Sequence, residues 1–159
     1  MKITIVCVGK IKEKFYMDAV QEYQKRLGRY CSLEIVEVAD EKTKEEAADN
    51  EINLVKNREG ERILKKVRDD GYVIALAIDG VSLDSVELSE KIARLGVHGI
   101  SRIYFVIGGS LGLSDAVLQR ADYKLSFSRM TFPHQLMRVI LLEQIYRSYR
   151  IMNHEPYHK

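Results

Sequence analysis

The end of the chain gathers residue types that can move protons and bind phosphate. Three of the four histidines, His134, His154 and His158, lie within the last 26 residues. A histidine titrates near neutral pH, and arginine binds phosphate oxygens. The pattern is typical either of a site for an anionic substrate or of a basic, frayed C-terminus. The neighbouring basic and aromatic residues are Arg138, Arg147, Arg150, Tyr149 and Tyr157.

None of these histidines has the spacing of a metal site. There is no His-x-x-His motif and no Cys pair near them, so we expect no bound metal. We expect His154 and His158 to lie on an extended tail, since Pro156 lies between them.

A second candidate is the glycine cluster "GGSLGLS" at residues 108–114, directly after the apolar run "IYFVIG". Glycine allows a close approach of backbone to ligand or a positive φ. In open α/β sheets, ligands bind beyond the carboxyl ends of the strands. The cluster is therefore either a binding edge or a tight strand-to-helix turn with Ser114 as the helix N-cap.

Common nucleotide motifs do not explain this cluster. The residues after Gly108 are Gly, Ser and Leu, so the dinucleotide fingerprint Gly-x-Gly-x-x-Gly fails. Gly-Lys-Ser/Thr occurs nowhere in the chain, which excludes the phosphate loop of the NTPases.

The same cluster matches a nucleophile elbow. Gly108-Gly109-Ser110-Leu111-Gly112 has the form Gly-x-Ser-x-Gly, and Asp122 and His134 follow in the order of a hydrolase triad. Against this, the next helix is expected to begin near Ser114, whereas an elbow runs into its helix almost at once. A serine hydrolase using Ser110 is kept as an alternative function.

The elements that would position these residues alternate along the chain. Five β-rich runs are separated by helical stretches, which predicts an α/β fold with a parallel sheet and helices on both faces. No linker interrupts the pattern, so we expect one domain over residues 1–159. Gly60 is interpreted as a weak point in the long second helix. The expected strands are 3–9, 33–38, 72–78, 103–108 and 123–127, and the helices are 15–27, 45–67, 85–97, 114–120 and 133–150.

The gross composition restricts the classes of protein. Hydrophobic residues make up 46% and charged residues 30% of 159, as in a soluble globular protein. A net charge of +2 is too small to indicate nucleic-acid binding by itself. Neither a signal peptide nor a membrane span is evident, so we expect a cytoplasmic protein in which Cys7 and Cys31 are reduced.

The last helix is apolar on two sides. Leu136, Val139 and Ile140 share one side with Tyr146, and a second apolar side is formed by Met137, Leu141 and Ile145. A helix that is apolar all round is buried all round. We expect the sheet to cover one side and a second subunit the other, which predicts a homodimer. Two polar exceptions, Arg138 and Glu143, would pair at that interface or reach into a site.

Several segments together resemble the RlmH family, which are SPOUT-class methyltransferases that act on a pseudouridine of large-subunit ribosomal RNA. The segments span essentially the whole chain: "MKITIVCVGKIK", "REGERIL", "YVIALAIDG", "IGGSLGLS", "LSFSRMTFPHQLMRVILLEQIYRSYRI" and "PYHK". The resemblance implies a SPOUT fold with a trefoil knot at about residues 70–155, a homodimer, and S-adenosyl-L-methionine as cofactor. It also implies methylation of N3 of a pseudouridine in 23S rRNA, in the stem-loop at the subunit interface of the assembled ribosome.

The resemblance also implies roles for individual residues. We expect His158 to accept or orient the proton, Tyr157 to stack on the base, and Arg138 to act as an anchor near the pocket. A non-catalytic RNA-binding dimer is the remaining alternative. The expected cofactor-binding residues are Leu76, Gly108, Phe127, Ser128, Arg129, Met130, Thr131 and Phe132.

Overall fold

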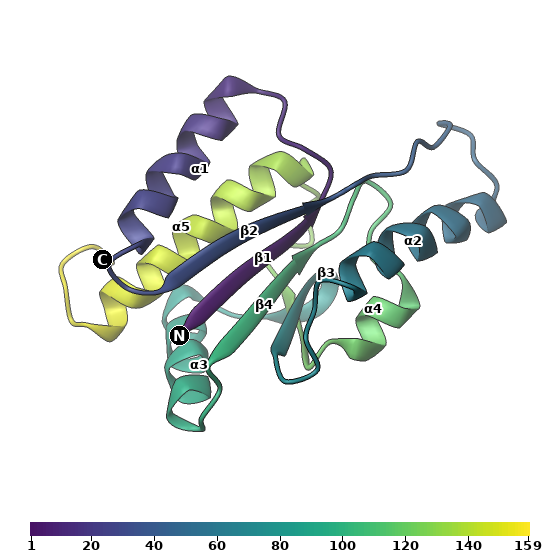
Figure 1. Ribbon diagram of the computed structural model, residues 1–159. Helices are drawn as coiled ribbons and strands as arrows, with labels where there is room; N and C mark the ends of the chain where they lie inside the picture. The colour runs from purple at the N-terminus through teal and green to yellow at the C-terminus, as the bar shows by residue number, and fades with distance from the viewer.

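A computed structural model describes residues 1–159, which form a five-stranded parallel sheet flanked by helices (Figure 1). The strand order is β2-β1-β4-β3-β5, and every neighbouring pair is parallel. The predicted α/β architecture is therefore confirmed. The strands are β1 (Lys2–Val8), β2 (Ser32–Val38), β3 (Tyr72–Ser82), β4 (Arg102–Ile107) and β5 (Tyr123–Ser126). The helices are α1 (Lys14–Leu27), α2 (Asp49–Leu64), α3 (Ser85–Val97), α4 (Asp115–Arg120) and α5 (His134–Met152).

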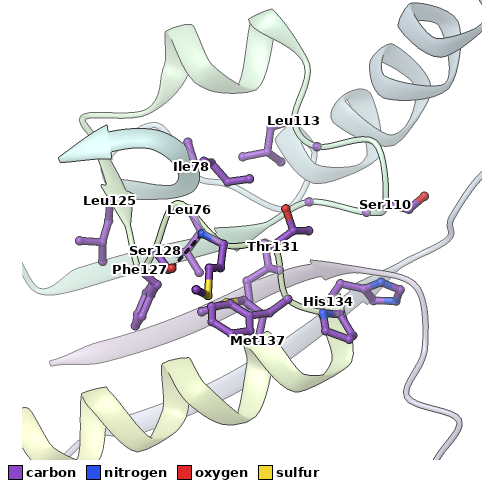
Figure 2. Close-up of a pocket in the computed structure, with 18 residues that line it drawn as sticks. Leu76, Ile78, Ser110, Leu113, Leu125, Phe127, Ser128, Thr131, His134 and Met137 are labelled. Atoms are coloured by element: carbon purple, nitrogen blue, oxygen red, sulfur yellow. Dashed lines mark hydrogen bonds between the residues drawn. The ribbon is translucent and has the colours of Figure 1, made fainter. Parts of the chain in front are cut away.

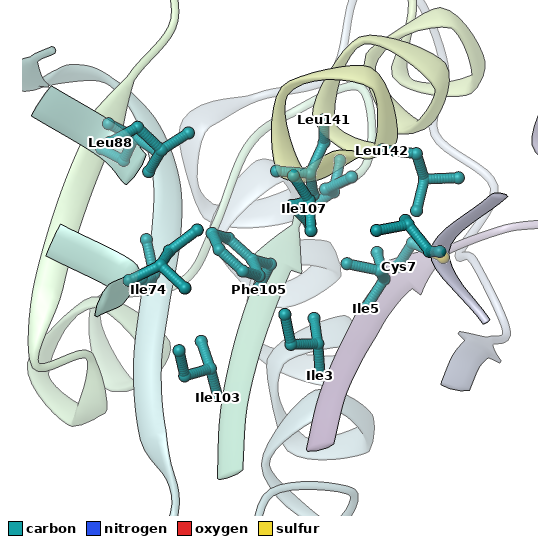
Figure 3. Packing of buried hydrophobic residues seen from close by; sticks show 14 of the residues in the cluster. Ile3, Ile5, Cys7, Ile74, Leu88, Ile103, Phe105, Ile107, Leu141 and Leu142 are labelled. Atoms are coloured by element: carbon teal, nitrogen blue, oxygen red, sulfur yellow. The ribbon is translucent and has the colours of Figure 1, made fainter. Parts of the chain in front are cut away.

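Helices cover both faces of the sheet because its central strands are apolar on both faces. Along β1, Ile3, Ile5 and Cys7 point to the face that carries α1, α3 and α5, where they join the larger core (Figure 3). The alternate residues Val6 and Val8 point to the opposite face, where α2 and α4 complete a smaller core. This alternation explains the continuous apolar runs in the sequence.

Strand β3 is longer and less regular than the sequence indicates. We predicted its end at Ile78, but it continues to Ser82. Its pairing with β5 shifts register, so that Leu125 lies opposite both Leu76 and Val81. Gly80 makes this bulge possible, because a Cβ there would lie 2.7 Å from the carbonyl oxygen of Lys124.

Helix α2 is shorter than predicted and is not broken at Gly60. It begins at Asp49 instead of residue 45 and ends at Leu64. Gly60 is buried within it, and a Cβ at this position would lie 2.3 Å from Oγ of Ser114. The interpretation of Gly60 as a weak point is therefore wrong; the glycine lets α2 pack closely against the start of α4.

Helix α5 lies between α1 and α3 on the sheet, and this arrangement accounts for its apolar circumference (Figure 1). Leu141, Leu142 and Ile145 are fully buried, and none of the other apolar side chains of α5 is exposed. Leu136, Val139 and Ile140 on the other side are only half-buried, so helices of the same chain cover that side in part. That a second subunit covers the rest stays a prediction.

The structure bears on the expectations for the two cysteines and for membrane-spanning helices. Both cysteines are free thiols, with Cys7 buried and Cys31 half-buried. Among the helices, none is at once long enough and apolar enough to cross a membrane.

Candidate functional site: a cavity at the carboxyl ends of three strands

A cavity of about 510 Å³ lies where β3, β4 and β5 end and α5 begins (Figure 2). Ligand sites for small molecules are typically about 300–1,000 Å³ and mostly apolar. The edge is the one at which parallel α/β sheets bind ligands. The cavity is lined by residues 76–78 of β3, residues 107–110, 112 and 113 after β4, residues 125, 127, 128 and 130–133 after β5, and His134 and Met137 of α5.

The first wall belongs to β3. Leu76 is the last residue before the register shift with β5, and the bulge carries Ala77 and Ile78 along the cavity. Ser126 of β5 secures this wall, because its hydroxyl donates to the carbonyl oxygen of Ile78 at 2.8 Å. The bulge therefore forms part of the cavity wall.

The second wall is the glycine cluster after β4. A turn joins Gly109 and Gly112, closed by a 3.1 Å hydrogen bond from the Gly112 N–H to the Gly109 carbonyl. Gly112 has φ of +87°, and a Cβ on Gly108 would lie 2.9 Å from the carbonyl carbon of Gly112. Side chains would therefore distort this turn. The cap interpretation of the cluster is confirmed, since Ser114 caps α4 by accepting the Val117 N–H at 3.3 Å. The cluster also lines the cavity, and ligand binding there stays a prediction.

The third wall is the segment 127–132, for which the resemblance implies cofactor binding. Its start is braced by Ser128, whose Oγ accepts the Met130 N–H at 2.9 Å (Figure 2). Of the eight expected cofactor residues, the structure brings seven to the cavity wall, and the exception is Arg129, which is exposed and does not line it. The seven are Leu76, Gly108, Phe127, Ser128, Met130, Thr131 and Phe132.

His134 is the one titratable side chain on the cavity wall. Burial lowers its pKa below the ordinary 6.5, and the nearby positive charge of Arg138 lowers it further. The carboxylate of Asp40 acts in the opposite direction without reversing the shift. The imidazole is therefore mostly neutral at pH 7 and can accept a proton or a hydrogen bond there.

The serine-hydrolase alternative is wrong. Ser110 and His134 lie at the cavity, beyond the carboxyl ends of the strands. Asp122 instead accepts the N–H of Val73, at the amino end of β3, with a distance of 2.8 Å. The sheet separates the acid from the other two residues, and α4 starts only at Asp115, too late for a nucleophile elbow.

Arg138 lies beneath the cavity edge and is not part of the wall. Its side chain is 1% exposed, and its guanidinium donates to the Glu37 carboxylate at 2.6 Å and to the Gly9 carbonyl at 2.6 Å. It therefore fastens α5 to the ends of β1 and β2. These contacts use the fork of the guanidinium for structure. The role that the resemblance implies for Arg138, an anchor near the pocket, stays a prediction.

The tail lies at the other end of α5. The hydroxyl of Tyr157 donates to Glu143 at 2.5 Å, and its ring packs edge-on against Tyr146 at 5.0 Å. Nδ1 of His158 lies 3.2 Å from the guanidinium of Arg147. Arg147 lies thirteen positions after His134 along α5, about 20 Å at 1.5 Å per residue. Within one chain, Tyr157 and His158 are thus not brought to the cavity.

Sequence reasoning did not assign several residues of the wall. Ile78, Leu113 and Met137 supply much of its apolar surface. Their apolar character was visible, but nothing local distinguishes a side chain that lines a cavity from one that packs in a core. Pro133 and His134 follow the expected cofactor segment directly, and that adjacency was the available signal.

The wall suits a ligand with an aromatic ring. Leu76, Leu125 and Met137 present apolar surface, while the glycine turn and the 127–132 segment bring backbone polar groups close. The first turn of α5 adds N–H groups that have no partner within the helix. Pro133 provides no side-chain cap for them. A cofactor such as S-adenosyl-L-methionine, with a purine and a carboxylate, fits this combination of walls.

Comparisons with known proteins agree with this geometry. A family model described as "Predicted SPOUT methyltransferase" matches residues 1–158. The chain is 65% identical to the "Ribosomal RNA large subunit methyltransferase H" of Bifidobacterium adolescentis and 60% identical to that of Clostridioides difficile, each over the full length of both chains.

A solved structure supports the fold. The structure of a probable methylase family protein from Haemophilus influenzae matches 99% of this chain and 70% of its own, with a TM-score of 0.54 at 16% identity. At that identity the match concerns the fold alone. The family model and the full-length relatives carry the assignment: this chain belongs to the SPOUT methyltransferase family.

Proposed function

We propose that this protein transfers the methyl group of S-adenosyl-L-methionine to N3 of a pseudouridine in 23S rRNA of the assembled ribosome. The observation that carries the proposal is the cavity, because its three walls are the segments for which the resemblance implies cofactor binding. The full-length relatives bear the name of a ribosomal RNA large subunit methyltransferase. A cytoplasmic location follows from the ribosomal substrate. The proposal includes a trefoil knot at about residues 70–155.

The cofactor would be held mainly by backbone and apolar side chains. Leu76 and the segment 127–132 would enclose its ring, with backbone groups reading the adenine edge. The glycine turn that starts at Gly108 would allow the ligand to lie against the main chain. The N-terminus of α5 at His134 would favour its carboxylate through the partial positive charge of that helix end.

The protein has little covalent chemistry to perform. When bound, the cofactor supplies a methyl group that its sulfonium already activates. The residues of the chain must hold the base nitrogen in line with that methyl group and accept the imide proton. We assign Tyr157 to stacking on the base and His158 to accepting or orienting the proton.

These assignments require a homodimer. Tyr157 is held at Glu143 and His158 at Arg147. These positions lie six and ten residues beyond Met137 of the cavity wall, or about 9 and 15 Å along the helix axis. The mouth of the cavity also carries exposed apolar side chains, with Ile78 54%, Met130 74% and Phe132 37% exposed. Such side chains are typical of a surface that a partner covers. In the proposed dimer, the tail of one copy completes the cavity of the other.

The proposed RNA contact is small. The net charge is only +2, so the free energy available from phosphate contacts is limited. Basic residues near both ends of the chain could bind phosphates, and the assembled ribosome would add contacts through its shape. The candidate residues are Lys10, Lys12, Lys14, Lys25, Arg26, Arg29, Arg147, Arg150 and Lys159.

One assay tests the proposed activity. Ribosomes from cells lacking the protein are incubated with labelled cofactor, and the labelled nucleotide is identified by mass spectrometry. We expect label at N3 of one pseudouridine in 70S ribosomes and little in naked 23S rRNA. Equal labelling of naked rRNA contradicts the assembled substrate. RNA binding without any heat of cofactor binding in calorimetry would favour the non-catalytic RNA-binding dimer.

A complementation assay tests the shared site. One variant lacks residues 156–159, and the other carries Gly108→Val, which fills the glycine wall. Each homodimer should be inactive. Mixed dimers should regain activity, because they contain one intact cavity together with one intact tail from the other copy. No recovery, with mixed dimers verified by native mass spectrometry, contradicts a tail that acts across the dimer.

A further inference from the structure

Helix α2 buries one carboxylate. Glu59 is 4% exposed, although its neighbours Arg58 and Glu61 on the same helix are exposed. Its Oε2 accepts the backbone N–H of Glu41 at 3.0 Å. No protein group donates to Oε1, which is buried as well. A buried carboxylate oxygen without a donor destabilises a fold, so its retention calls for a reason.

The unpaired oxygen lies against the outer side of the glycine turn. A Cβ on Gly109 would lie 3.1 Å from Oε1 and 3.4 Å from Oε2 of Glu59. The inner side of the same turn lines the cavity, through Gly108, Gly109 and Ser110. Glu59 and the cavity are therefore separated by a single layer of backbone.

The next residue of α2 supports the far end of the same segment. Gly60 packs against Ser114, where the segment enters α4. Glu59 and Gly60 thus contact both ends of the turn region 109–114. Close packing against α2 therefore restricts the conformations that the turn can adopt.

The charged groups around Glu59 are few. Asp40 and Glu41 face it from the loop after β2, and Arg62 faces it from the next turn of α2. Arg62 is engaged elsewhere, since its guanidinium donates to the Glu41 carboxylate and to the Ala39 carbonyl. The segment 108–114 contributes no charged residue. Burial is the main reason why the pKa of Glu59 is raised, and Asp40 and Glu41 raise it as well.

A donor for Oε1 is available in the turn itself. The bond that closes the turn runs from the Gly112 N–H to the Gly109 carbonyl. The N–H groups of Ser110 and Leu111, at the centre of the turn, take no part in that bond. They follow Gly109 directly, and a Cβ on Gly109 would lie 3.1 Å from Oε1, so these two N–H groups are the candidate donors from the turn.

We propose that Glu59 is a positioning residue for the cofactor site: its Oε1 accepts a backbone N–H of the turn 109–112 when the cofactor fills the cavity. The bond holds the turn in the shape that contacts the ligand. This inference rests on the proposed function, because it takes S-adenosyl-L-methionine as the ligand.

The bond predicts a proton release on binding. A hydrogen bond to the ionised carboxylate favours the charged form, so the pKa of Glu59 is lower in the complex than in the free protein. Between these two pKa values, binding releases a proton and affinity rises with pH. Below both values, the affinity is constant and weaker; above both, it is constant and stronger. The window reaches above the ordinary pKa of glutamate because burial raises the free value.

Calorimetry measures this release directly. S-adenosyl-L-methionine is titrated into the full-length protein at several pH values, in buffers of different ionisation enthalpy, and the proton count follows from the dependence of the heat on the buffer. Glu59→Gln keeps the shape of the side chain but cannot titrate, and its amide has one acceptor oxygen where the carboxylate has two. We expect weaker cofactor binding than in wild type above the window, with the carboxylate-dependent proton release lost.

Three variants separate this effect from others. Glu61→Gln, on the exposed side of α2, should retain the full release. His134→Gln removes the titratable group on the cavity wall and should leave the component due to Glu59 intact. Glu59→Ala should weaken cofactor binding about tenfold, because the donor in the turn loses its acceptor. Thermal unfolding confirms that each variant is folded before it is titrated.

A double-mutant comparison provides a second test of the contact between Glu59 and the turn. Gly109→Ala places a methyl group against the carboxylate and should weaken cofactor binding; combined with Glu59→Ala, its penalty should fall because one of its contacts is gone. The inference is overturned if the losses of cofactor-binding free energy in the two single variants are strictly additive in the double variant. It is also overturned if wild type and Glu59→Gln release the same number of protons. In either case the proposed function stands as long as wild type binds S-adenosyl-L-methionine. If wild type binds no S-adenosyl-L-methionine, the proposed function and this inference fall together.

Discussion

Arg138 of α5 and Glu37 of β2, which are 101 residues apart in the sequence, are joined by a 2.6 Å hydrogen bond. The arginine is buried, while the side chain of Glu37 is 38% exposed at the sheet end. The same guanidinium also donates to the carbonyl of Gly9 after β1. One side chain thereby connects the helix that starts at the cavity to two strand ends.

This connection predicts that Arg138 acts through stability. Arg138→Met should lower the free energy of unfolding by on the order of 3 kcal/mol, because Glu37 and the Gly9 carbonyl lose their donor. Arg138→Lys should restore only part of it, since an ammonium cannot reproduce the fork. Urea denaturation measures the change, with Arg26→Met on the exposed side of α1 as a control that keeps the wild-type midpoint.

An unchanged unfolding midpoint in Arg138→Met, together with lost methyl transfer, contradicts a structural role. That outcome would place the guanidinium among the groups that contact the ligands.

Replacing Gly60 should destabilise the protein although it lies within a helix. Alanine is favoured over glycine in a helix by about 1 kcal/mol, but the new Cβ would lie 2.3 Å from Oγ of Ser114. Overpacking of this kind costs about 1–3 kcal/mol. Gly96→Ala in α3 is the matched control, because its Cβ would meet only Cε of Met1 at 3.7 Å, and it should be neutral or stabilising. Denaturation midpoints that rise in both variants would show that the contact at Gly60 relaxes freely.

Gly108→Ala should impair the cavity more than the fold. Its Cβ would lie 2.9 Å from the carbonyl carbon of Gly112, so the turn must shift where it lines the cavity. We expect the Kd for S-adenosyl-L-methionine to rise at least about tenfold, equivalent to about 1.4 kcal/mol, in isothermal titration calorimetry. Gly96→Ala serves again as the control with unchanged Kd. A Kd within twofold of wild type for Gly108→Ala would mean that the turn does not contact the cofactor.

Cys7 should resist alkylation in the folded protein. Burial raises its pKa from the ordinary 9.0 to about 11, which leaves roughly 100-fold less thiolate at pH 8. Iodoacetamide should therefore modify Cys7 only slowly before unfolding and rapidly in guanidinium chloride. Peptide mass spectrometry distinguishes it from Cys31, whose pKa is also raised to about 11 by burial. Fast native labelling of Cys7 would reveal local opening of β1.

The alternation of elements was predictable because it depends on local patterns. A strand that is apolar throughout, such as β1 or β4, must be covered on both faces of its sheet. Because helical segments separate these strands in the sequence, a parallel α/β sheet follows. Ser114 as the cap of α4 was predictable for the same reason, since a cap depends on residues three apart. Gly60 was misread because its constraint comes from Ser114, 54 positions away.

The sequence by itself determined the alternation of strands and helices and the family resemblance, and seven of the eight cofactor residues that the resemblance implies lie on the cavity wall. These features depend on residue types and on neighbours close in the chain. Tertiary structure decided which residues share a space. It placed Asp122 at the opposite end of the strands from Ser110, joined Arg138 to two strand ends, and kept the tail off the cavity wall of its own chain. The physical reason is that such proximity depends on how the sheet orders its strands and how α5 lies upon it, which no local pattern encodes.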